Sequence, residues 1–288
     1  MNQLSKNRTI INVIGIPAII YLLWQGGLLF ALFVLLVMMI GINEFYRLTT
    51  TKDQSPIKIF GYIFTFILAG YYFLLLNINE FQFYTFLSNG AADPLLTVLC
   101  ILIVILFLFE MKRNVINPTR NIAITLLGVI YVPLLLGTLI ALRNLDSEQN
   151  TNFTICMILS IWICDSAAFV FGMKWGKKKI LPRISPNKSW VGCIAGLLSA
   201  IVFFLASSYH GFLPDLSNLD ILALSIITGF FGQAGDFAES LIKRDLGVKD
   251  SGTILLGHGG VLDRFDSIIF SSPLTFAYLT FIYFPRVS

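Results

Sequence analysis

Carboxylates and cations alternate near the C-terminal end of this sequence, in the longest polar stretch of an apolar chain. On a helix, Asp236, Ser240 and Lys243 stand at positions i, i+4 and i+7 and therefore share one face. Asp263 and Asp266 stand three residues apart and share a face of the following helix. Converging carboxylates beside cations suit Mg²⁺, which prefers oxygen ligands and takes one or two carboxylates together with substrate phosphate oxygens. The stretch therefore predicts a divalent-metal site that handles phosphates.

Two other residues of this stretch have less specific interpretations. His258 precedes Gly259 and Gly260, which let the backbone approach a ligand closely. The histidine is a metal ligand, an acid or base, or a loop residue near phosphate. Glu239 stands four residues before Lys243, a spacing typical of a surface ion pair worth a few tenths of a kcal/mol. We therefore interpret Glu239 as a surface residue.

A basic segment joins two apolar runs upstream, and its cations are Lys174, Lys177, Lys178, Lys179, Arg183 and Lys188. Such a loop binds anions. For Lys177 to Lys179, contact with anionic lipid, at about 1 kcal/mol per cation, is as good an interpretation as contact with a substrate. Four residues beside a proline and a tryptophan are interpreted as contacts of a nucleotide phosphate or base: Ser185, Asn187, Lys188 and Ser189.

Asp165 lies inside an apolar run. A charged side chain there costs about 2.5–3.5 kcal/mol on insertion scales and usually faces a partner or a watery cavity. We therefore place Asp165 with the residues that bind the nucleotide.

The elements that must position these residues are membrane helices. The chain has 288 residues, of which 56% are hydrophobic and 12% charged, whereas soluble domains have about 25% charged residues. Apolar runs long enough to cross a bilayer recur along the whole chain. They predict about nine helices, of which the first two and the eighth are short, near residues 10–24, 28–43, 59–76, 94–110, 122–142, 153–173, 190–208, 221–236 and 261–284.

The distribution of Lys and Arg predicts the orientation of these helices. If the N-terminus is cytoplasmic, 18 of the 20 basic residues fall on the inner side, and only Arg143 and Arg286 fall elsewhere. Such an asymmetry fixes orientation during insertion. All three polar segments then meet the cytoplasmic side of the membrane.

Residues from Ser240 to Asp266 resemble the signature of phosphatidate cytidylyltransferases (CDP-diacylglycerol synthases), with the pattern S-x-x-K-R-x4-K-D-x-G-x5-H-G-G-x-x-D-R-x-D. The resemblance continues upstream and spans roughly residues 160–270. Two positions depart from the family pattern: Leu256 replaces a usual proline, and Val191 replaces a common acidic residue. These departures concern fine geometry and substrate preference rather than the reaction class.

The resemblance implies an all-helical membrane enzyme, often a homodimer, that joins CTP and phosphatidate into CDP-diacylglycerol with release of pyrophosphate. It also implies a divalent metal, Mg²⁺ or another, on Asp236 and Asp263, and leaves room for a second, monovalent ion. We assign Asp266 and Asp250 to the support of this site. The cations assigned to the phosphates of CTP or of the lipid are Lys243, Arg244, Lys249 and Arg264.

The expected organisation is an N-terminal set of five helices in residues 1–150 and a C-terminal set of four in residues 151–288 that carries the signature. The expected place is the plasma (inner) membrane if the source is bacterial, with CTP, phosphatidate and the bilayer as partners and no nucleic acid. Two alternatives stay open. One is a CTP-dependent transferase that acts on another lipid phosphate or a polyprenol. The other is a cation-coupled transporter with an ion path along Asp165, Asp236 and Asp263.

Overall fold

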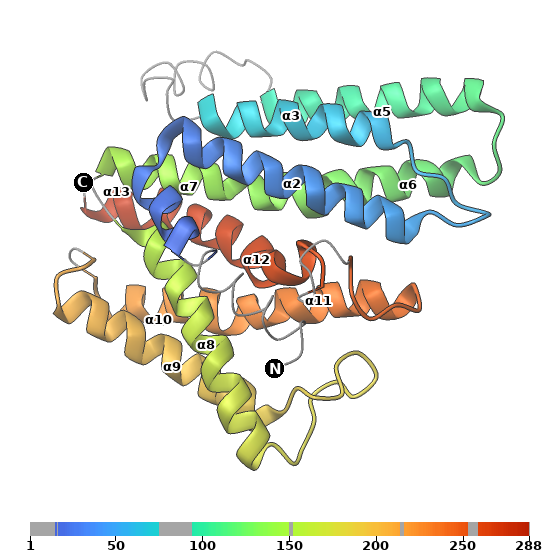
Figure 1. Ribbon diagram of the computed structural model, residues 1–288. Helices are drawn as coiled ribbons and strands as arrows, with labels where there is room; N and C mark the ends of the chain where they lie inside the picture. The colour runs from blue at the N-terminus through green and yellow to red at the C-terminus, as the bar shows by residue number, and fades with distance from the viewer. Residues whose placement is uncertain are drawn as a thin grey trace.

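The computed structural model describes residues 15, 17–74, 94–149, 152–213, 216–252 and 259–287, and most of these residues are helical (Figure 1). Within those ranges no strand occurs, and an isolated β-bridge joins Lys179 to Ser189. The predicted all-α class is therefore confirmed.

The N-terminal part of the bundle begins with the helical residues 17–25 and continues with α2 (Gly27–Thr49), α3 (Lys58–Leu74), α5 (Pro94–Arg113), α6 (Pro118–Val129) and α7 (Leu135–Gln149). The π-helical turn η1 (Ile130–Leu134) joins α6 to α7 without a break and contains Pro133. Proline lacks the N–H of a helical hydrogen bond, and a wider turn accommodates the missing bond.

The C-terminal part contains α8 (Phe153–Trp175), α9 (Trp190–Tyr209), α10 (Asn218–Ile226), α11 (Gly232–Asp245), α12 (Leu262–Tyr278) and α13 (Phe284–Val287). Two further π-helical turns, η2 (Ile227–Phe231) and η3 (Leu279–Tyr283), join α10 to α11 and α12 to α13. Each pair therefore forms one continuous helix through the bundle.

Crossing a hydrocarbon layer of about 30 Å takes about 20 helical residues. Seven helical segments in the described parts of the chain are long and apolar enough for this: Gly27–Thr49, Pro94–Arg113, Pro118–Ser147, Phe153–Trp175, Trp190–Tyr209, Asn218–Asp245 and Leu262–Val287. The 17-residue helix α3 is a shorter apolar helix. The predicted architecture of several membrane spans is therefore confirmed.

Two helices are longer than the sequence predicts. The second and eighth were expected to be short, but α2 has 23 residues and Asn218–Asp245 has 28. The apolar pattern of the eighth helix fades near residue 236, yet the helix continues because its last turns bury Glu239 and Lys243 on one side. As a result, Asp236 and Lys243 lie on one continuous helix.

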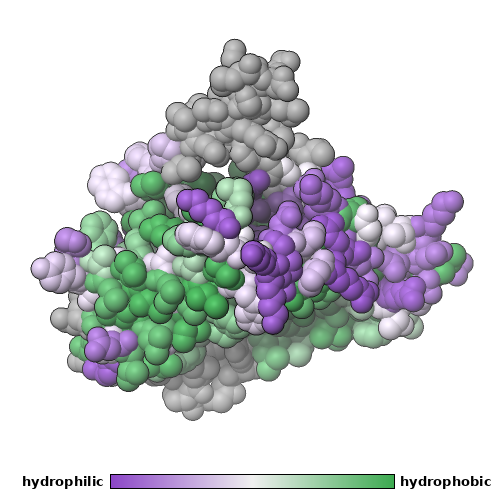
Figure 2. Space-filling view, turned by 90° about the horizontal axis from the view of Figure 1, so that it is seen from below, coloured by the Kyte–Doolittle hydropathy of each residue, from purple (hydrophilic) through white to green (hydrophobic). Residues whose placement is uncertain are grey.

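The packing brings the sequence-distant segments together. Helix α8 packs along α9, and α12 packs against both α7 and α11. The loops that follow α2, α5, α8 and α11 lie on the right of Figure 1. We call this side of the bundle the basic end, because its exposed residues include Lys177, Lys178, Arg183, Arg244 and Lys249. Figure 2 shows hydrophilic residues gathered toward the same side.

Candidate active site

A cavity of about 750 Å³ lies at the basic end, between α8, α11, α12 and the loop that precedes α9. This volume is within the range of small-molecule sites. Helix α8 contributes Trp162 and Phe169 to its wall. The charged residues that line it are Asp165, Asp236, Asp263, Asp266, Lys179, Lys188 and Arg264. The cavity therefore collects residues from all three polar segments of the sequence.

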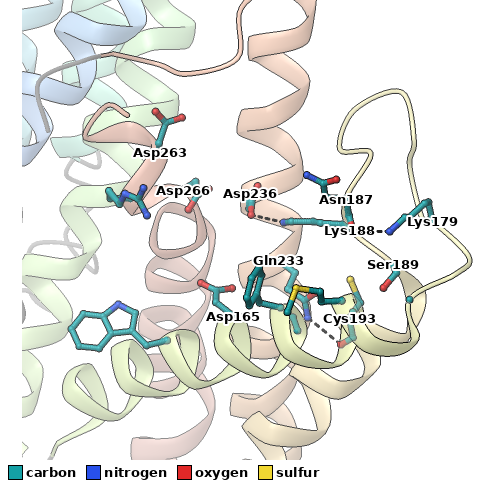
Figure 3. A pocket seen from close by; sticks show the side chains of 17 residues that line it. Asp165, Lys179, Asn187, Lys188, Ser189, Cys193, Gln233, Asp236, Asp263 and Asp266 are labelled. Carbon is teal, nitrogen blue, oxygen red and sulfur yellow. Dashed lines mark hydrogen bonds and ion pairs between the residues drawn. The ribbon is translucent and has the colours of Figure 1, made fainter. Parts of the chain in front are cut away.

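Three carboxylates from three helices surround one space in this cavity. Asp165 belongs to α8, Asp236 to α11 and Asp266 to α12, and Figure 3 shows them grouped together. Their negative charges interact with one another. Like charges at close range repel, so this arrangement needs a positive charge from the protein or from a ligand.

The loop before α9 supplies one such charge. Lys188 Nζ lies 2.5 Å from Asp236 Oδ2 and 4.4 Å from the ring centroid of Phe237. The loop holds a fixed shape because Ile180 N donates to Lys188 O and Trp190 N donates to Lys178 O. The sequence between α8 and α9 thus folds back on itself and directs Lys188 toward α11.

Asp263 lies near the start of α12 and is more heavily hydrogen-bonded than the other three carboxylates. Its Oδ2 accepts hydrogen bonds from Gly260 N at 2.7 Å, Ser251 N at 2.9 Å and Ser251 Oγ at 3.0 Å. Its Oδ1 lies 2.5 Å from Lys243 Nζ. Asp263 lines the same cavity as Asp236, and its carboxylate is fixed from two sides.

Glu239 is not the surface residue that the spacing predicts. The side chain is 2% exposed, and its Oε1 lies 3.3 Å from Lys243 Nζ, which also contacts Asp263. The prediction was wrong because this part of α11 is covered by α12, which the i, i+4 pattern alone does not reveal. Lys243 therefore lies between two acidic residues inside the bundle.

Known proteins are similar in sequence to this chain over almost its whole length. Residues 6–282 match the cytidylyltransferase family. This chain belongs to that family. It is 30% identical over 272 residues to the phosphatidate cytidylyltransferase of Bacillus subtilis (94% of this chain, 96% of the relative). It is 31% identical to the proteins of that name from Staphylococcus haemolyticus, over 274 residues, and Staphylococcus aureus, over 275 (each 93% of this chain, 96% of the relative).

Family membership confirms the resemblance seen in the signature, and the remaining signature residues occupy different places. Arg264 lines the cavity, as does Asn187. Ser189 also lines it, and its Oγ accepts a hydrogen bond from Gly192 N at 3.3 Å, which caps α9. Ser185 is half-buried in the same loop and is not among the cavity-lining residues described.

Three signature residues at and just after the end of α11, Arg244, Lys249 and Asp250, are not among the residues that line the cavity. Arg244 donates to Ile184 O at 3.2 Å and so ties the loop before α9 to the end of α11. Lys249 and Asp250 are exposed. His258 and Leu256 lie outside the described residues, and Val191 is exposed in the first turn of α9.

Two polar residues of the site, Gln233 and Glu44, were not singled out in the sequence analysis. Gln233 lines the cavity from α11 and donates to Gly229 O at 2.5 Å and Cys193 O at 3.1 Å. Glu44 is buried in α2 and contacts Ser251 beside Asp263. Both stand in apolar stretches, so the rule that identified Asp165 also applies to Glu44.

The donor set of this cytidylyltransferase site fits a hard divalent cation. Its protein donors are carboxylate oxygens, which Mg²⁺ prefers, and Mg²⁺ usually binds through one or two carboxylates plus substrate phosphate. Among the described residues no group of three or more acidic, histidine or cysteine side chains forms a complete metal cage. A cation here would therefore need oxygen atoms from phosphate or water.

Proposed function

We propose that this chain transfers CMP from CTP to phosphatidate, which gives CDP-diacylglycerol and pyrophosphate. The observation that carries the proposal is the meeting of Asp165, Asp236 and Asp266, from three membrane helices, with Lys188 in one cavity. The names of the relatives from Bacillus and Staphylococcus support the choice of phosphatidate as acceptor. CDP-diacylglycerol is a precursor for phospholipids, so the activity belongs to phospholipid biosynthesis.

Phosphatidate brings its own nucleophile to this reaction. A phosphate monoester has a second pKa near 6, so it is largely dianionic at neutral pH. One of its oxygens attacks the α-phosphorus of CTP, a new P–O bond forms, and the bond to the β-phosphate oxygen breaks with release of pyrophosphate. No strong protein base is needed, and the main barrier is the approach of two polyanions.

The charged residues of the cavity can offset the repulsion between the two polyanions. We assign Lys188, Lys179 and Arg264 to the phosphates, because they line the cavity that the carboxylates share. Asp236 and Asp263, with Asp266 in support, would hold a divalent metal, which would supply positive charge at the triphosphate. Lys243 holds Asp263 from the side of α11. The exposed Arg244, Lys249 and Asp250 remain proposed phosphate or support residues at the rim.

The membrane setting separates the two substrates. The positive-inside asymmetry supports a cytoplasmic basic end and N-terminus, and the bacterial relatives support the plasma (inner) membrane. CTP then enters from the cytoplasm, while the acyl chains of phosphatidate stay between the helices and the lipid. We also propose that the chain acts as a homodimer.

The direct test is turnover by the purified protein in detergent micelles. With CTP, phosphatidate and Mg²⁺, we expect CDP-diacylglycerol and pyrophosphate in equal amounts, and we expect a chelator to stop the reaction. Parallel reactions with a polyprenol or another lipid phosphate identify the acceptor. Turnover only with one of these would overturn the lipid assignment, and ion flux in liposomes without CTP consumption would indicate a transporter.

A further inference from the structure

Glu44 is a buried carboxylate near the end of α2, far in sequence from the signature. The residue is 1% exposed. Its Oε1 accepts a hydrogen bond from Val261 N at 3.0 Å, and its Oε2 accepts from Leu262 N at 3.0 Å. Ser251 Oγ lies 3.2 Å from the same Oε2, and its single hydrogen is shared between this oxygen and Asp263 Oδ2. These donors include the first backbone N–H groups of α12, which have no partner within the helix. A negative charge at this position also interacts favourably with the helix dipole.

The backbone around Glu44 leaves no space for larger residues. A Cβ on Gly252 would lie 2.5 Å from Glu44 Oε1, and a Cβ on Gly260 would lie 2.5 Å from Glu44 Oε2. Real Cβ atoms essentially never approach other atoms this closely. Both glycines therefore let the chain close around the carboxylate, and Glu44 fixes the residues on either side of it.

Ser251 links Glu44 to Asp263. The Ser251 hydroxyl lies 3.2 Å from Glu44 Oε2 and 3.0 Å from Asp263 Oδ2, and its backbone N–H donates to the same Asp263 oxygen. Gly260 N, adjacent to the capped start of α12, donates to that oxygen as well. Glu44 therefore holds the donors that orient Asp263, although no direct contact between the two carboxylates is needed.

We propose that Glu44 is a positioning residue for the cytidylyltransferase site, which acts on Asp263 through Ser251 and the start of α12. The proposal rests on the proposed function, because it assumes that Asp263 takes part in handling CTP and its metal. It connects the first membrane helices, where the sequence shows no motif, to the reaction. Partners that orient a metal-binding side chain typically contribute 10- to 100-fold to affinity or activity.

The chemistry of the contact suggests Glu44→Gln as the variant. Val261 N–H and Leu262 N–H donate to different oxygens of Glu44. An amide has one oxygen and one NH₂ group, so in either orientation one backbone donor would face another donor. The start of α12 would then shift, and Asp263 would lose its alignment.

Glu110→Gln is the matched control. Glu110 is 5% exposed in α5, and both of its oxygens also accept from donors, Asn121 Nδ2 at 2.6 Å and Arg113 NH1 at 3.3 Å. The substitution therefore creates the same conflict in a place that does not line the cavity. A general loss of packing would affect both variants, whereas a loss of positioning would affect Glu44→Gln alone.

The experiment measures kcat at saturating CTP, the Mg²⁺ concentration at half-maximal rate, and the Tm of each purified variant with and without Mg²⁺ and CTP. Relative to Glu110→Gln, we expect Glu44→Gln to lower kcat by about tenfold or more and to raise the half-maximal Mg²⁺ concentration. We also expect a smaller rise of Tm with Mg²⁺ and CTP. A kcat within about threefold of that of Glu110→Gln, with the same Mg²⁺ dependence, would overturn the proposal.

A second variant and a binding measurement test the proposal if the first variant does not fold or the wild type does not use phosphatidate. If Glu44→Gln does not fold, Ser251→Ala removes only the link, and we expect it to lower kcat by several-fold with an unchanged Tm; full activity would overturn the proposal. If the wild type does not use phosphatidate, the proposed function fails, and the rise of Tm with Mg²⁺ and CTP still tests Glu44 independently. An equal rise in Glu44→Gln and the wild type would then overturn the positioning role.

Discussion

Two acidic groups at the basic end differ in how their charge is balanced. In the N-terminal half, Glu110 accepts from Asn121 and pairs with Arg113, and Arg113 NH1 donates to Ser55 O at 2.7 Å. Asn121 Oδ1 accepts in turn from Ser55 N at 2.7 Å. These residues belong to α5, α6 and the α2–α3 connection, so the network closes on itself and joins that connection to the two helices.

The cavity group in the C-terminal half is open by comparison. Asp165, Asp236 and Asp266 repel one another, and Lys188 pairs with Asp236 from the loop before α9. Burying carboxylates against each other has a cost that folding alone does not justify. The difference teaches that a closed polar network at a membrane surface serves structure, whereas an open one faces a ligand.

The strongest way to break this comparison is Asp263→Asn against Asp220→Asn. The amide at position 263 leaves the buried Lys243 without its carboxylate, and its NH₂ meets the donors that now serve Oδ2. We expect kcat to fall by about 100- to 1,000-fold, as for the loss of one strong charge interaction in a reaction site. The measurement is CDP-diacylglycerol formation per folded protein.

Asp220 is the control because it is a still more deeply buried carboxylate in a closed group. It is 0% exposed near the opposite end of the bundle and contacts Ser217, Tyr278 and Arg286. Asp220→Asn should lower the Tm and leave kcat nearly unchanged. If the two variants lost activity equally, the distinction between open and closed groups would be wrong.

A smaller effect is expected for Lys188→Met against Lys178→Met. Lys188 contacts Asp236 inside the cavity, whereas Lys178 is exposed on the same loop. A hydrogen bond to a charged group contributes about 1.5–3 kcal/mol, so kcat/KM for CTP should fall by about 10- to 100-fold in Lys188→Met. Lys178→Met should change kcat/KM little. Equal losses would instead assign the loop to general anion attraction.

The sequence predicts the charged residues that line the cavity better than it predicts the residues that support them. Asp165, Asp236 and Asp266 were predicted from charge in apolar runs and from spacing, and the structure brings them together. Glu239 was misinterpreted because the i, i+4 rule describes an isolated helix and does not take account of helix α12, which covers this side chain. Glu44 also carries a charge in an apolar run, but the rule was applied only to Asp165, and no sequence pattern displays the backbone N–H groups that Glu44 binds.

The same limit applies to the fold. Apolar runs located the membrane helices, because the number of consecutive apolar residues can be counted in the sequence. The run near residues 221–236 ended too early, since the last turns of α11 are stabilised by burial against α12 rather than by their own composition. The π-turns between α6 and α7 and between α10 and α11 were not predicted, and Pro133 is the single proline within these two turns.

The smallest expected effect concerns Ser189, whose hydroxyl has two proposed uses. Its Oγ caps α9 through Gly192 N, and the side chain also lines the cavity. Ser217 caps α10 in the same way near the opposite end, through Asp220 N at 3.3 Å. Loss of a cap costs about 0.5–2 kcal/mol, so Ser189→Ala and Ser217→Ala should lower the free energy of unfolding by similar amounts.

Only Ser189→Ala should also affect the nucleotide. One neutral hydrogen bond contributes about 0.5–1.5 kcal/mol, which corresponds to a rise of about two- to tenfold in the KM for CTP. Steady-state kinetics and thermal unfolding of both variants separate the two uses. An unchanged KM in Ser189→Ala would restrict this serine to capping, and the nucleotide contacts of the loop would then reduce to Asn187 and Lys188, which also line the cavity.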